Sequence, residues 1–417
     1  MKKSDLLKLS VGNIGNAWAF MMIFLFLPNF LIEDIFTGDP LANTLAYSVI
    51  TISITAGAIT YLFAGYISDK TMTRWGKRRP FFLLAIPAGI CYLFLGAVSS
   101  SAPVMTNFIF VTIIATVYAV LDRMQYCCYW SLYMDLTNPE ERITTSVTFN
   151  MFGLIGTVGA LFLTPILNKF LPFSTIIILV AGVYMATILF AFFFGPREDV
   201  EKLQDKRETQ GYFTCLKECV RERNFLIYLI ATFFFVLGYS ISVLILIPFI
   251  EYHSIGITYM LIALLPVALF YFYIFNRLAK TWGRLKAFKF ALLVGIITLP
   301  ICVFLAAGLV PLQFIPVFFI IVIILQVVIG ILTFQYAVLM DLTLEGREAF
   351  FAGLFLFVIV IPIPVSSSLI GPIRDFLSYE YLIWSGENFS FIVIFLITAI
   401  FLLVSYLFLR KIKIKKN

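Results

Sequence analysis

Long apolar runs alternate with short polar loops along the whole of this chain. A helix that crosses a lipid bilayer needs about 20 predominantly apolar residues, and we identify twelve runs that are long enough. They predict an all-α membrane protein with twelve transmembrane helices. The predicted spans are residues 10–32, 43–67, 80–98, 104–134, 145–167, 174–195, 225–250, 257–276, 287–308, 312–340, 349–372 and 389–409.

The loops between the spans divide the basic residues unequally between two sides. Of the 30 Lys and Arg residues, Lys169 and Arg374 fall on one side, Arg123 falls within a span, and the others fall on the opposite side. An excess of Lys and Arg marks the cytoplasmic side, so we expect a multi-pass protein of the cell (plasma or inner) membrane with both termini in the cytoplasm. The net charge of +7 then reflects topology and contact with membrane lipids, and does not indicate nucleic-acid binding.

The composition excludes a soluble enzyme. Charged residues make up 13% of the chain and hydrophobic residues 61%, whereas soluble domains carry about 25% charged residues. The chain contains no nucleotide-binding loop, catalytic triad or zinc-ligand spacing. Cys215 and Cys219 lie one helical turn apart, but no His lies near them, so we expect neither a metal site nor a cofactor.

The two halves of the chain contain matching motifs. Met-Asp-Leu-Thr at 134–137 recurs at 340–343, and Trp-Gly at 75–76 recurs at 282–283 at nearly the same offset, about half the chain. Parallel repeats of this kind build transporters from two similar bundles. We therefore predict a six-helix bundle over 1–195, a cytoplasmic linker loop over 196–224 with an interfacial helix at 212–221, and a second six-helix bundle over 225–417.

The loop after the second span reads GYISDKTMTRWGKRRPF from Gly65 to Phe81. It resembles the signature loop of the major facilitators, and its longer spacing is similar to that of the glycoside–pentoside–hexuronide cation symporters, closest to their sucrose-transporter branch. Residues 8–16 resemble the N-terminal signature of that family, and Tyr-Trp-Ser-Leu at 129–132 resembles a segment of melibiose-type permeases. The resemblance implies the major facilitator fold and a role in solute transport.

The chain departs from these relatives at positions that matter for ion and sugar binding. Melibiose-type members bind sodium with paired acids, and the corresponding positions here are near Gly57 and Tyr61. Their helix-four carboxylate corresponds to Tyr126, while Asp122 stands one turn earlier, where relatives often have tyrosine. These departures disfavour the sodium site of the relatives, and we expect H+ rather than Na+ as the coupling ion.

Asp122 and Arg123 are the charged residues that fall at membrane depth, away from the ends of the predicted spans. A charge at membrane depth costs a few kcal/mol even on lenient scales, so it usually marks a transport pathway. The alternative is a buried ion pair that only stabilises packing, but the repeat positions Val328 and Ile329 are uncharged, which favours a functional role. Helical spacing places the binding candidates on two adjacent stripes, formed by Asp122, Gln125, Tyr126 and Tyr129 and by Arg123 and Trp130.

Further candidates lie outside this helix. Asn13, Asn16 and Trp18 could line the site from the first span, although close packing through the neighbouring glycines explains that segment equally well. Gln335 and Tyr336 are repeat counterparts of Tyr129 and Trp130 and are expected to close the site from the second bundle. The predicted gating residues, which would form charge-assisted contacts on the inner side, are Asp69, Arg74, Arg78, Arg79, Asp135, Arg142, Asp341 and Arg347.

These patterns predict a secondary active transporter, a proton-coupled symporter of a sugar or glycoside that works by alternating access, with Asp122 as the proton carrier. Its partners would be a small solute, membrane lipids and H+, and we expect a monomer. One alternative is a lysolipid or amphiphile transporter of the same fold, which the polar stripe disfavours. Another is a receptor or scaffold that transports nothing, which the gating motif disfavours.

Overall fold

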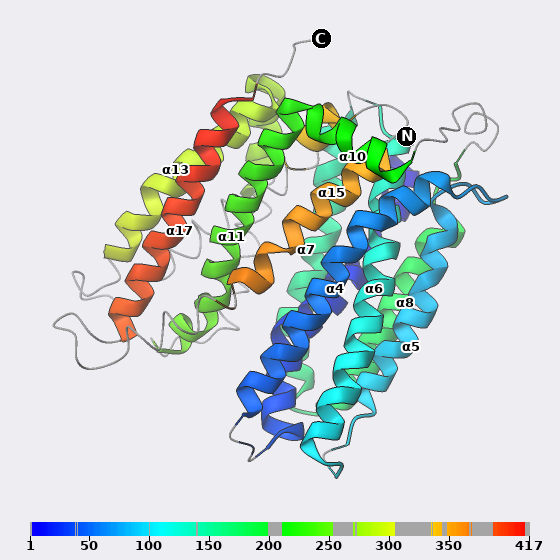
Figure 1. Cartoon of the computed structure of the whole chain (residues 1–417), viewed down its shortest axis with the longest axis vertical. Coiled ribbons are helices and arrows are strands. Elements are labelled where there is room, and N and C mark those ends of the chain that lie inside the picture. Colours follow the sequence, from blue (N-terminus) through cyan, green and yellow to red (C-terminus); the bar gives the residue numbers. More distant parts are fainter. Residues whose placement is uncertain are drawn as a thin grey trace. The chain divides into compact units, whose positions relative to one another are not determined.

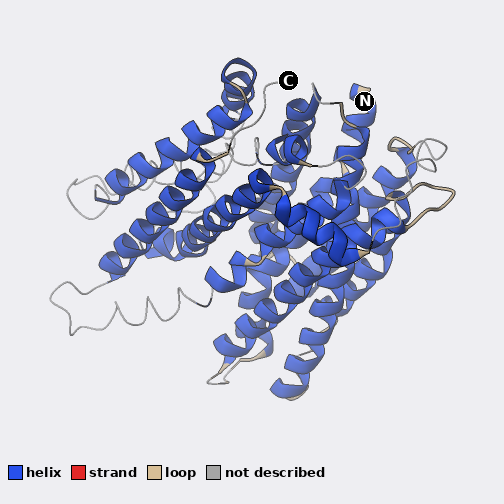
Figure 2. Cartoon of the chain, turned by 45° about the horizontal axis from the view of Figure 1, so that its top comes forward, coloured by secondary structure: helices blue, strands red, loops and turns tan. Residues whose placement is uncertain are grey.

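The described part of the chain folds almost entirely into helices in this computed structural model, and it contains no strand (Figure 2). The all-α prediction is therefore confirmed. The described residues are 2–37, 39, 41–99, 101–138, 141–198, 211–252, 270–271, 273–304, 335, 337–343, 348–366, 368 and 387–412.

Nine helical segments among the described residues are long and apolar enough to cross a membrane. They confirm nine of the predicted spans, and helix α13 covers the predicted span 287–308 as far as Phe304. The predicted spans 257–276 and 312–340 lie largely outside the described residues. The α-helices are α1 (Lys3–Ser10), α2 (Gly12–Met21), α3 (Leu27–Phe30), α4 (Ala42–Lys70), α5 (Ala85–Gly96), α6 (Val104–Leu136), α7 (Arg142–Leu167), α8 (Phe173–Phe194), α10 (Tyr212–Arg221), α11 (Arg223–Tyr252), α13 (Arg284–Phe304), α15 (Glu348–Val360) and α17 (Glu387–Arg410).

The first span is a continuous helical segment with two wider turns. The π-helices η1 (Met22–Phe26) and η2 (Leu31–Ile35) flank α3. Pro28 lies in α3, and a proline ring clashes with the carbonyl group one turn earlier in a regular α-helix. The wider turn of η1 lies where that clash would occur, so proline accounts for the first irregularity.

The helices form two compact units, Met1–Cys215 with Thr343–Phe357 and Leu216–Leu342 with Val358–Asn417. In the first unit α4 packs on α6, α5 packs on α6 and α8, and α2 packs on α7 and α8 (Figure 1). In the second unit α17 packs on α11 and α13. The predicted boundaries at 1–195, 196–224 and 225–417 remain a prediction. The helix predicted at 212–221 is present as α10, and its interfacial position remains a prediction.

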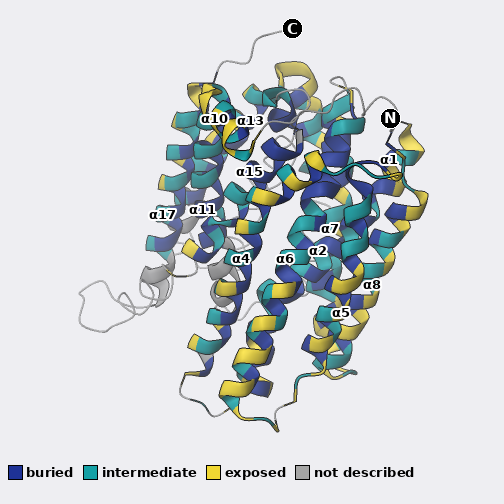
Figure 3. Cartoon of the chain, turned by 45° about the vertical axis from the view of Figure 1, so that its right-hand side comes forward, coloured by how far each residue is buried: buried dark blue, intermediate teal, exposed yellow. Residues whose placement is uncertain are grey.

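Burial follows the faces of these helices. The stripe of α6 that includes Tyr118, Asp122, Gln125 and Tyr129 is buried. Figure 3 shows buried and exposed residues mixed along the length of α6. Opposite faces carry exposed apolar side chains such as Ile113, which is the arrangement expected of a bundle that faces lipid on its outside.

Small residues allow α2 and α7 to approach each other closely. A Cβ atom added at Gly156 of α7 would overlap the backbone carbonyl group of Ile14. We predict that Gly156→Ala destabilises the protein by about 1–3 kcal/mol, because backbone cannot yield as a side chain can. Gly182→Ala in α8 is the control, since nothing lies within 4 Å of its Cβ position, and it should gain about 1 kcal/mol of helix propensity. Thermal unfolding in detergent measures both, and equal melting temperatures for the two variants would contradict the prediction.

The two repeated Trp-Gly motifs adopt the same unusual backbone conformation. Gly76 has φ +102° and Gly283 has φ +85°. Side-chain-bearing residues rarely adopt positive φ, whereas glycine does so readily. The internal repeat read from the sequence is therefore also a repeat of turn geometry.

Candidate functional site

Asp122 lies on the buried stripe of α6, and its side chain is 2% exposed. The Tyr184 hydroxyl in α8 donates a hydrogen bond to Asp122 Oδ1 over 3.0 Å. Asp122 Oδ2 lies 3.4 Å from Arg123 Nη1. A buried carboxylate needs such partners, because transfer of an unpaired charge out of water is very costly. The two charges predicted to mark the site thus pair with each other.

Arg123 bridges α6 to two other helices. Its Nη1 donates to the Tyr61 hydroxyl in α4 over 3.4 Å, and its guanidinium lies 4.6 Å from the centroid of the Phe20 ring in α2. Gly57 in α4 leaves room for its aliphatic part, since a Cβ there would lie 2.9 Å from Arg123 Cγ. Gly57 and Tyr61, which the sequence comparison places near the paired acids of melibiose-type symporters, thus both lie against the Arg123 side chain.

The aromatic residues of α6 pack around Phe149 of α7, which the sequence did not single out. The Phe149 ring lies 4.1 Å from that of Trp130, 5.4 Å from that of Tyr129 and 6.4 Å from that of Tyr126. The Tyr129 hydroxyl also donates to the carbonyl oxygen of Leu9. These three candidates form a packed cluster that joins α6 to α1 and α7.

The polar candidates of the first span differ in how they are satisfied. Asn13 Nδ2 donates to the carbonyl oxygen of Phe149 over 2.9 Å, so this amide holds α2 against α7. Asn16 is buried, and neither amide atom has a hydrogen-bond partner among the described residues. The same is true of Gln125 on α6, while the indole nitrogen of Trp18 is likewise unpartnered within the described part of the chain.

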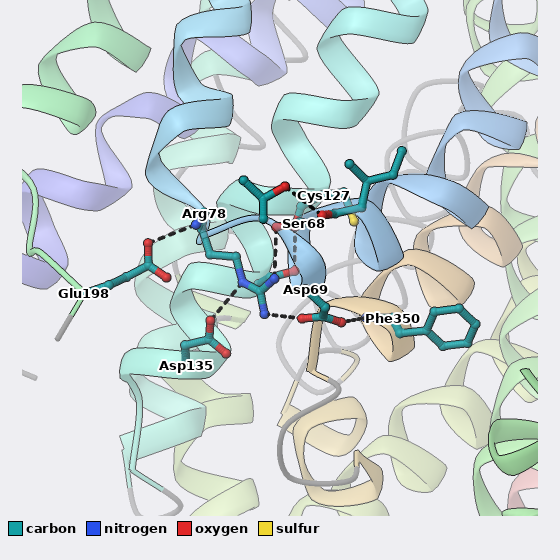
Figure 4. Close-up of polar contacts among 10 residues, drawn as sticks. Ser68, Asp69, Arg78, Cys127, Asp135, Glu198 and Phe350 are labelled. Carbon is teal, nitrogen blue, oxygen red and sulfur yellow. Dashed lines mark hydrogen bonds and ion pairs between the residues drawn. The ribbon is translucent and has the colours of Figure 1, made fainter. Parts of the chain in front are cut away.

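Arg78 is the centre of a second polar cluster, in the loop between α4 and α5 (Figure 4). It is fully buried. Its guanidinium donates to Asp69 Oδ1 over 2.6 Å, to Asp135 Oδ2 over 2.9 Å and to the Ser68 hydroxyl over 2.9 Å. Burial alone lowers the pKa of Arg78, but the two carboxylates hold that pKa above its ordinary value. Asp69, Arg78 and Asp135 are predicted gating residues, and the structure places them in direct contact. Their role in gating remains a prediction.

Asp69 also contacts the beginning of α15. The backbone N–H of Phe350 donates to Asp69 Oδ2 over 3.2 Å (Figure 4). The first N–H groups of a helix have no partner within the helix and carry partial positive charge, so a carboxylate there is favourable. One carboxylate therefore bonds both Arg78 and the N-terminus of another helix.

Glu198, which the sequence reasoning missed, fastens the segment after α8 to the same loop (Figure 4). Its Oε2 accepts from the backbone N–H of Arg78 over 2.9 Å and from that of Arg79 over 3.4 Å. The left-handed turn at Gly76 makes room, because a Cβ there would overlap the Glu198 carboxylate. Burial raises the pKa of Glu198, and the two hydrogen bonds lower it by less.

The raised pKa of Glu198 has a predictable sign. A folded state that holds a proton more tightly than the unfolded chain is stabilised below the ordinary glutamate pKa, and that stability is lost as pH rises through the raised pKa. Glu198→Gln keeps an acceptor oxygen without the charge. Its melting temperature should therefore exceed that of the wild type by more at about pH 8 than at about pH 5. Glu222→Gln, at an exposed position, is the control, and a pH-independent difference for Glu198→Gln would refute this assignment.

The second half repeats part of the Arg78 cluster. Arg284 Nη1 lies 2.5 Å from Asp341 Oδ1, and these residues correspond to Arg78 and Asp135 in the repeat. Asp69 corresponds to Asn276, whose Oδ1 has no partner among the described residues. Arg284 was not among the predicted gating residues, although the repeat offset could have identified it. Arg347 and Tyr336 lie outside the described residues.

The remaining candidates take other positions. Arg74 is exposed, with its guanidinium 4.8 Å from the Trp75 ring, and Arg79 donates to the carbonyl oxygen of Phe192. Arg142 begins α7. Gln335 is buried, and its backbone carbonyl oxygen accepts a hydrogen bond from the Tyr228 hydroxyl over 2.5 Å. No cluster of His, Cys, Asp or Glu that could hold a metal ion occurs in the described ranges.

The chain resembles known membrane transporters in sequence and in fold. Residues 9–367 match the family model of the Major Facilitator Superfamily. An isoprimeverose transporter of Lactiplantibacillus pentosus is 27% identical over 248 residues, which are 56% of this chain and 51% of that protein. The match thus spans about half the length of that relative.

Solved structures support the fold. A bacterial homologue of the iron transporter ferroportin, in its outward-facing state, superposes with a TM-score of 0.70 at 16% identity over 99% of both chains. The human organic anion transporter TETRAN superposes with a TM-score of 0.68 at 14% identity over 98% of this chain and 100% of that one. Such low identities bear on the fold alone.

Proposed function

Since the chain belongs to the Major Facilitator Superfamily and is a multi-pass membrane transporter rather than an enzyme, we propose that it is a proton-coupled symporter of a sugar or glycoside. The observation that carries this proposal is the buried carboxylate of Asp122 within a membrane-spanning helix. A buried carboxyl group with a hydroxyl partner and one cation nearby can bind and release a proton as its surroundings change.

The surroundings of Arg123 support protons over sodium. A sodium site requires oxygen ligands without a competing cation nearby. Here Gly57 and Tyr61, near the expected positions of the relatives' acids, instead contact the aliphatic part and the guanidinium of Arg123, respectively. An internal cation therefore occupies the neighbourhood where the resembling symporters hold their ion, and Asp122 is left as the proton carrier.

The likeness to the isoprimeverose transporter supports a sugar as the solute, and with the loop motif it supports the glycoside–pentoside–hexuronide family. In alternating access, the Arg78 cluster would stabilise one closed gate, and Arg284–Asp341 would form a weaker counterpart. We further propose that the protein is a monomer of the cell membrane, with two six-helix bundles and both termini in the cytoplasm.

Uptake into proteoliposomes tests this function. Labelled isoprimeverose, a panel of neutral disaccharides and a labelled lysolipid would each be supplied outside vesicles with an acidic exterior, a sodium gradient or neither. We expect accumulation of at least one sugar under the proton gradient, its loss on addition of a protonophore, and no stimulation by sodium. Uptake of a lysolipid without any sugar uptake, or transport driven by sodium, would contradict the proposal.

A further inference from the structure

Helices α1–α2 and α6 run past each other in opposite directions. The Tyr133 hydroxyl, near the end of α6, donates to the Ser10 hydroxyl over 3.0 Å. Earlier in α6, Arg123 lies against Phe20 at 4.6 Å. Residue numbers thus rise along α1–α2 in the direction in which they fall along α6, so the two segments are antiparallel. Asn16, between Ser10 and Phe20, is therefore level with the part of α6 between Arg123 and Tyr133.

Asn16 and Gln125 also lie on the faces by which α2 and α6 approach each other. On the first segment, a Cβ added at Gly12, one turn before Asn16, would lie 3.0 Å from the Tyr129 hydroxyl. On α6, Gln125 shares the stripe of Asp122 and Tyr129 because residues three and four apart lie on one face. Asn16 and Gln125 are consequently brought to the same level between these helices, about one turn from Asp122.

Both amides are buried and unsatisfied. Asn16 is 5% exposed and Gln125 is 0% exposed, and neither nitrogen nor oxygen of either amide meets a partner within the described part of the chain. Buried polar groups are almost always hydrogen-bonded, and a buried polar group without a hydrogen-bond partner destabilises the fold. Asn13, one turn away, shows the contrast, since its amide bonds a backbone carbonyl group. Both amides therefore lack a partner among the described residues and are available to a ligand.

The nearby charges decide what that partner is. Asp122 Oδ2 lies 3.4 Å from Arg123 Nη1, so the two charges compensate each other. Tyr184 bonds the carboxylate, and Tyr61 bonds the guanidinium. The unsatisfied groups are neutral amides, and each offers donors and an acceptor, which matches a hydroxyl group that both donates and accepts. A carboxylate or ammonium group placed here would find no free countercharge in the described part of the chain and would lose its hydration.

We propose that Asn16 and Gln125 form a subsite for neighbouring hydroxyl groups of an uncharged sugar, and that this subsite rejects uronic acids and amino sugars. This inference rests on the proposed transport of sugars. It adds to it the residues that recognise the hydroxyl groups and the restriction to neutral ligands.

Binding in detergent tests the subsite separately from transport. The probes are labelled isoprimeverose and matched disaccharides in which one ring is glucose, glucuronate or glucosamine, the last at a pH where its amine is charged. Asn16→Leu and Gln125→Met keep size but remove the amides. Each should raise the Kd of the neutral probes at least about tenfold, as loss of one or two hydrogen bonds does. Each should also raise the melting temperature of the ligand-free protein, because an unsatisfied buried group is gone.

Asn107→Leu is the control. Asn107 is buried like the other two, but its Nδ2 donates to the carbonyl oxygens of Ser99 and Ala102 over 2.9 and 3.3 Å. This variant should lower the melting temperature and leave Kd unchanged. The opposite signs distinguish a binding amide from a structural one.

The outcomes separate the two proposals. Unchanged Kd in Asn16→Leu and Gln125→Met, lowered melting temperatures in both, or equal binding of charged and neutral probes overturns the subsite. No binding of any neutral probe to the wild type overturns its ligand class. Binding with the expected variant effects, but without uptake into vesicles, supports the subsite and overturns the transport function.

Discussion

Arg78→Met is expected to abolish most transport and to destabilise the protein by about 3–5 kcal/mol, the usual cost of removing one partner from a buried ionic cluster. The variant would leave Asp69 and Asp135 facing each other without the guanidinium that bonds both. It would also leave the Ser68 hydroxyl without its donor. Melting temperature in detergent and initial uptake rate measure the two effects.

The control and the rescue make this prediction specific. Arg74→Met, in the same loop but exposed, should change stability by no more than about 0.5 kcal/mol. A triple variant that adds Asp69→Asn and Asp135→Asn to Arg78→Met removes the uncompensated charges, so it should recover much of the stability but not the transport. A fully active Arg78→Met protein would show that the cluster has no part in gating.

Asp122→Asn is expected to end uphill accumulation while solute exchange across the membrane continues. Asparagine retains an oxygen that can accept from Tyr184, but it cannot bind a proton. A pH difference of one unit supports at most about tenfold accumulation for one proton per solute. In the variant, the inside-to-outside ratio should settle near unity. Counterflow of labelled sugar, which needs no proton gradient, should persist.

The unpaired Arg123 complicates a single substitution, because loss of the Asp122 charge leaves a buried guanidinium without its carboxylate. Asp122→Asn combined with Arg123→Gln removes both charges and should fold with a melting temperature closer to that of the wild type. It should still exchange sugar without accumulating it. Asp34→Asn, at an exposed position, serves as the control. Undiminished accumulation in Asp122→Asn would end the role of this residue in coupling.

Much of the architecture followed from one-dimensional patterns. The apolar runs correspond to helices wherever the structure describes them, and the segment predicted to be helical at 212–221 is α10. The internal repeat was visible as short matching sequence motifs. The structure adds that Gly76 and Gly283 both have positive φ and that the ion pairs Arg78–Asp135 and Arg284–Asp341 correspond. The helices, the repeated motifs and the glycine turns depend on local composition and on spacing within one helix or turn, whereas each ion pair joins residues 57 positions apart.

The roles of individual candidates could not be read in this way. Tyr129 and Asn13 looked like binding residues, but the polar groups of both bond backbone carbonyl groups of other helices. Glu198 looked like one of many linker charges, yet it bonds the backbone of a loop 120 residues away in the chain. Hydroxyl, amide and carboxylate groups serve equally well in packing and in binding, and only their neighbours distinguish the two.

The sequence by itself determined that Asp122 and Arg123 lie at membrane depth on adjacent stripes of one helix. It could do so because the length of a span and the helical period are local properties of the chain. Only the tertiary structure decided that Asp122 pairs with Arg123 and accepts from Tyr184, 62 residues away, and that Asn16 and Gln125 are left unsatisfied. Those outcomes depend on which helices pack together, on their relative direction and on the rotation of each about its axis, and packing among several helices sets all three at once.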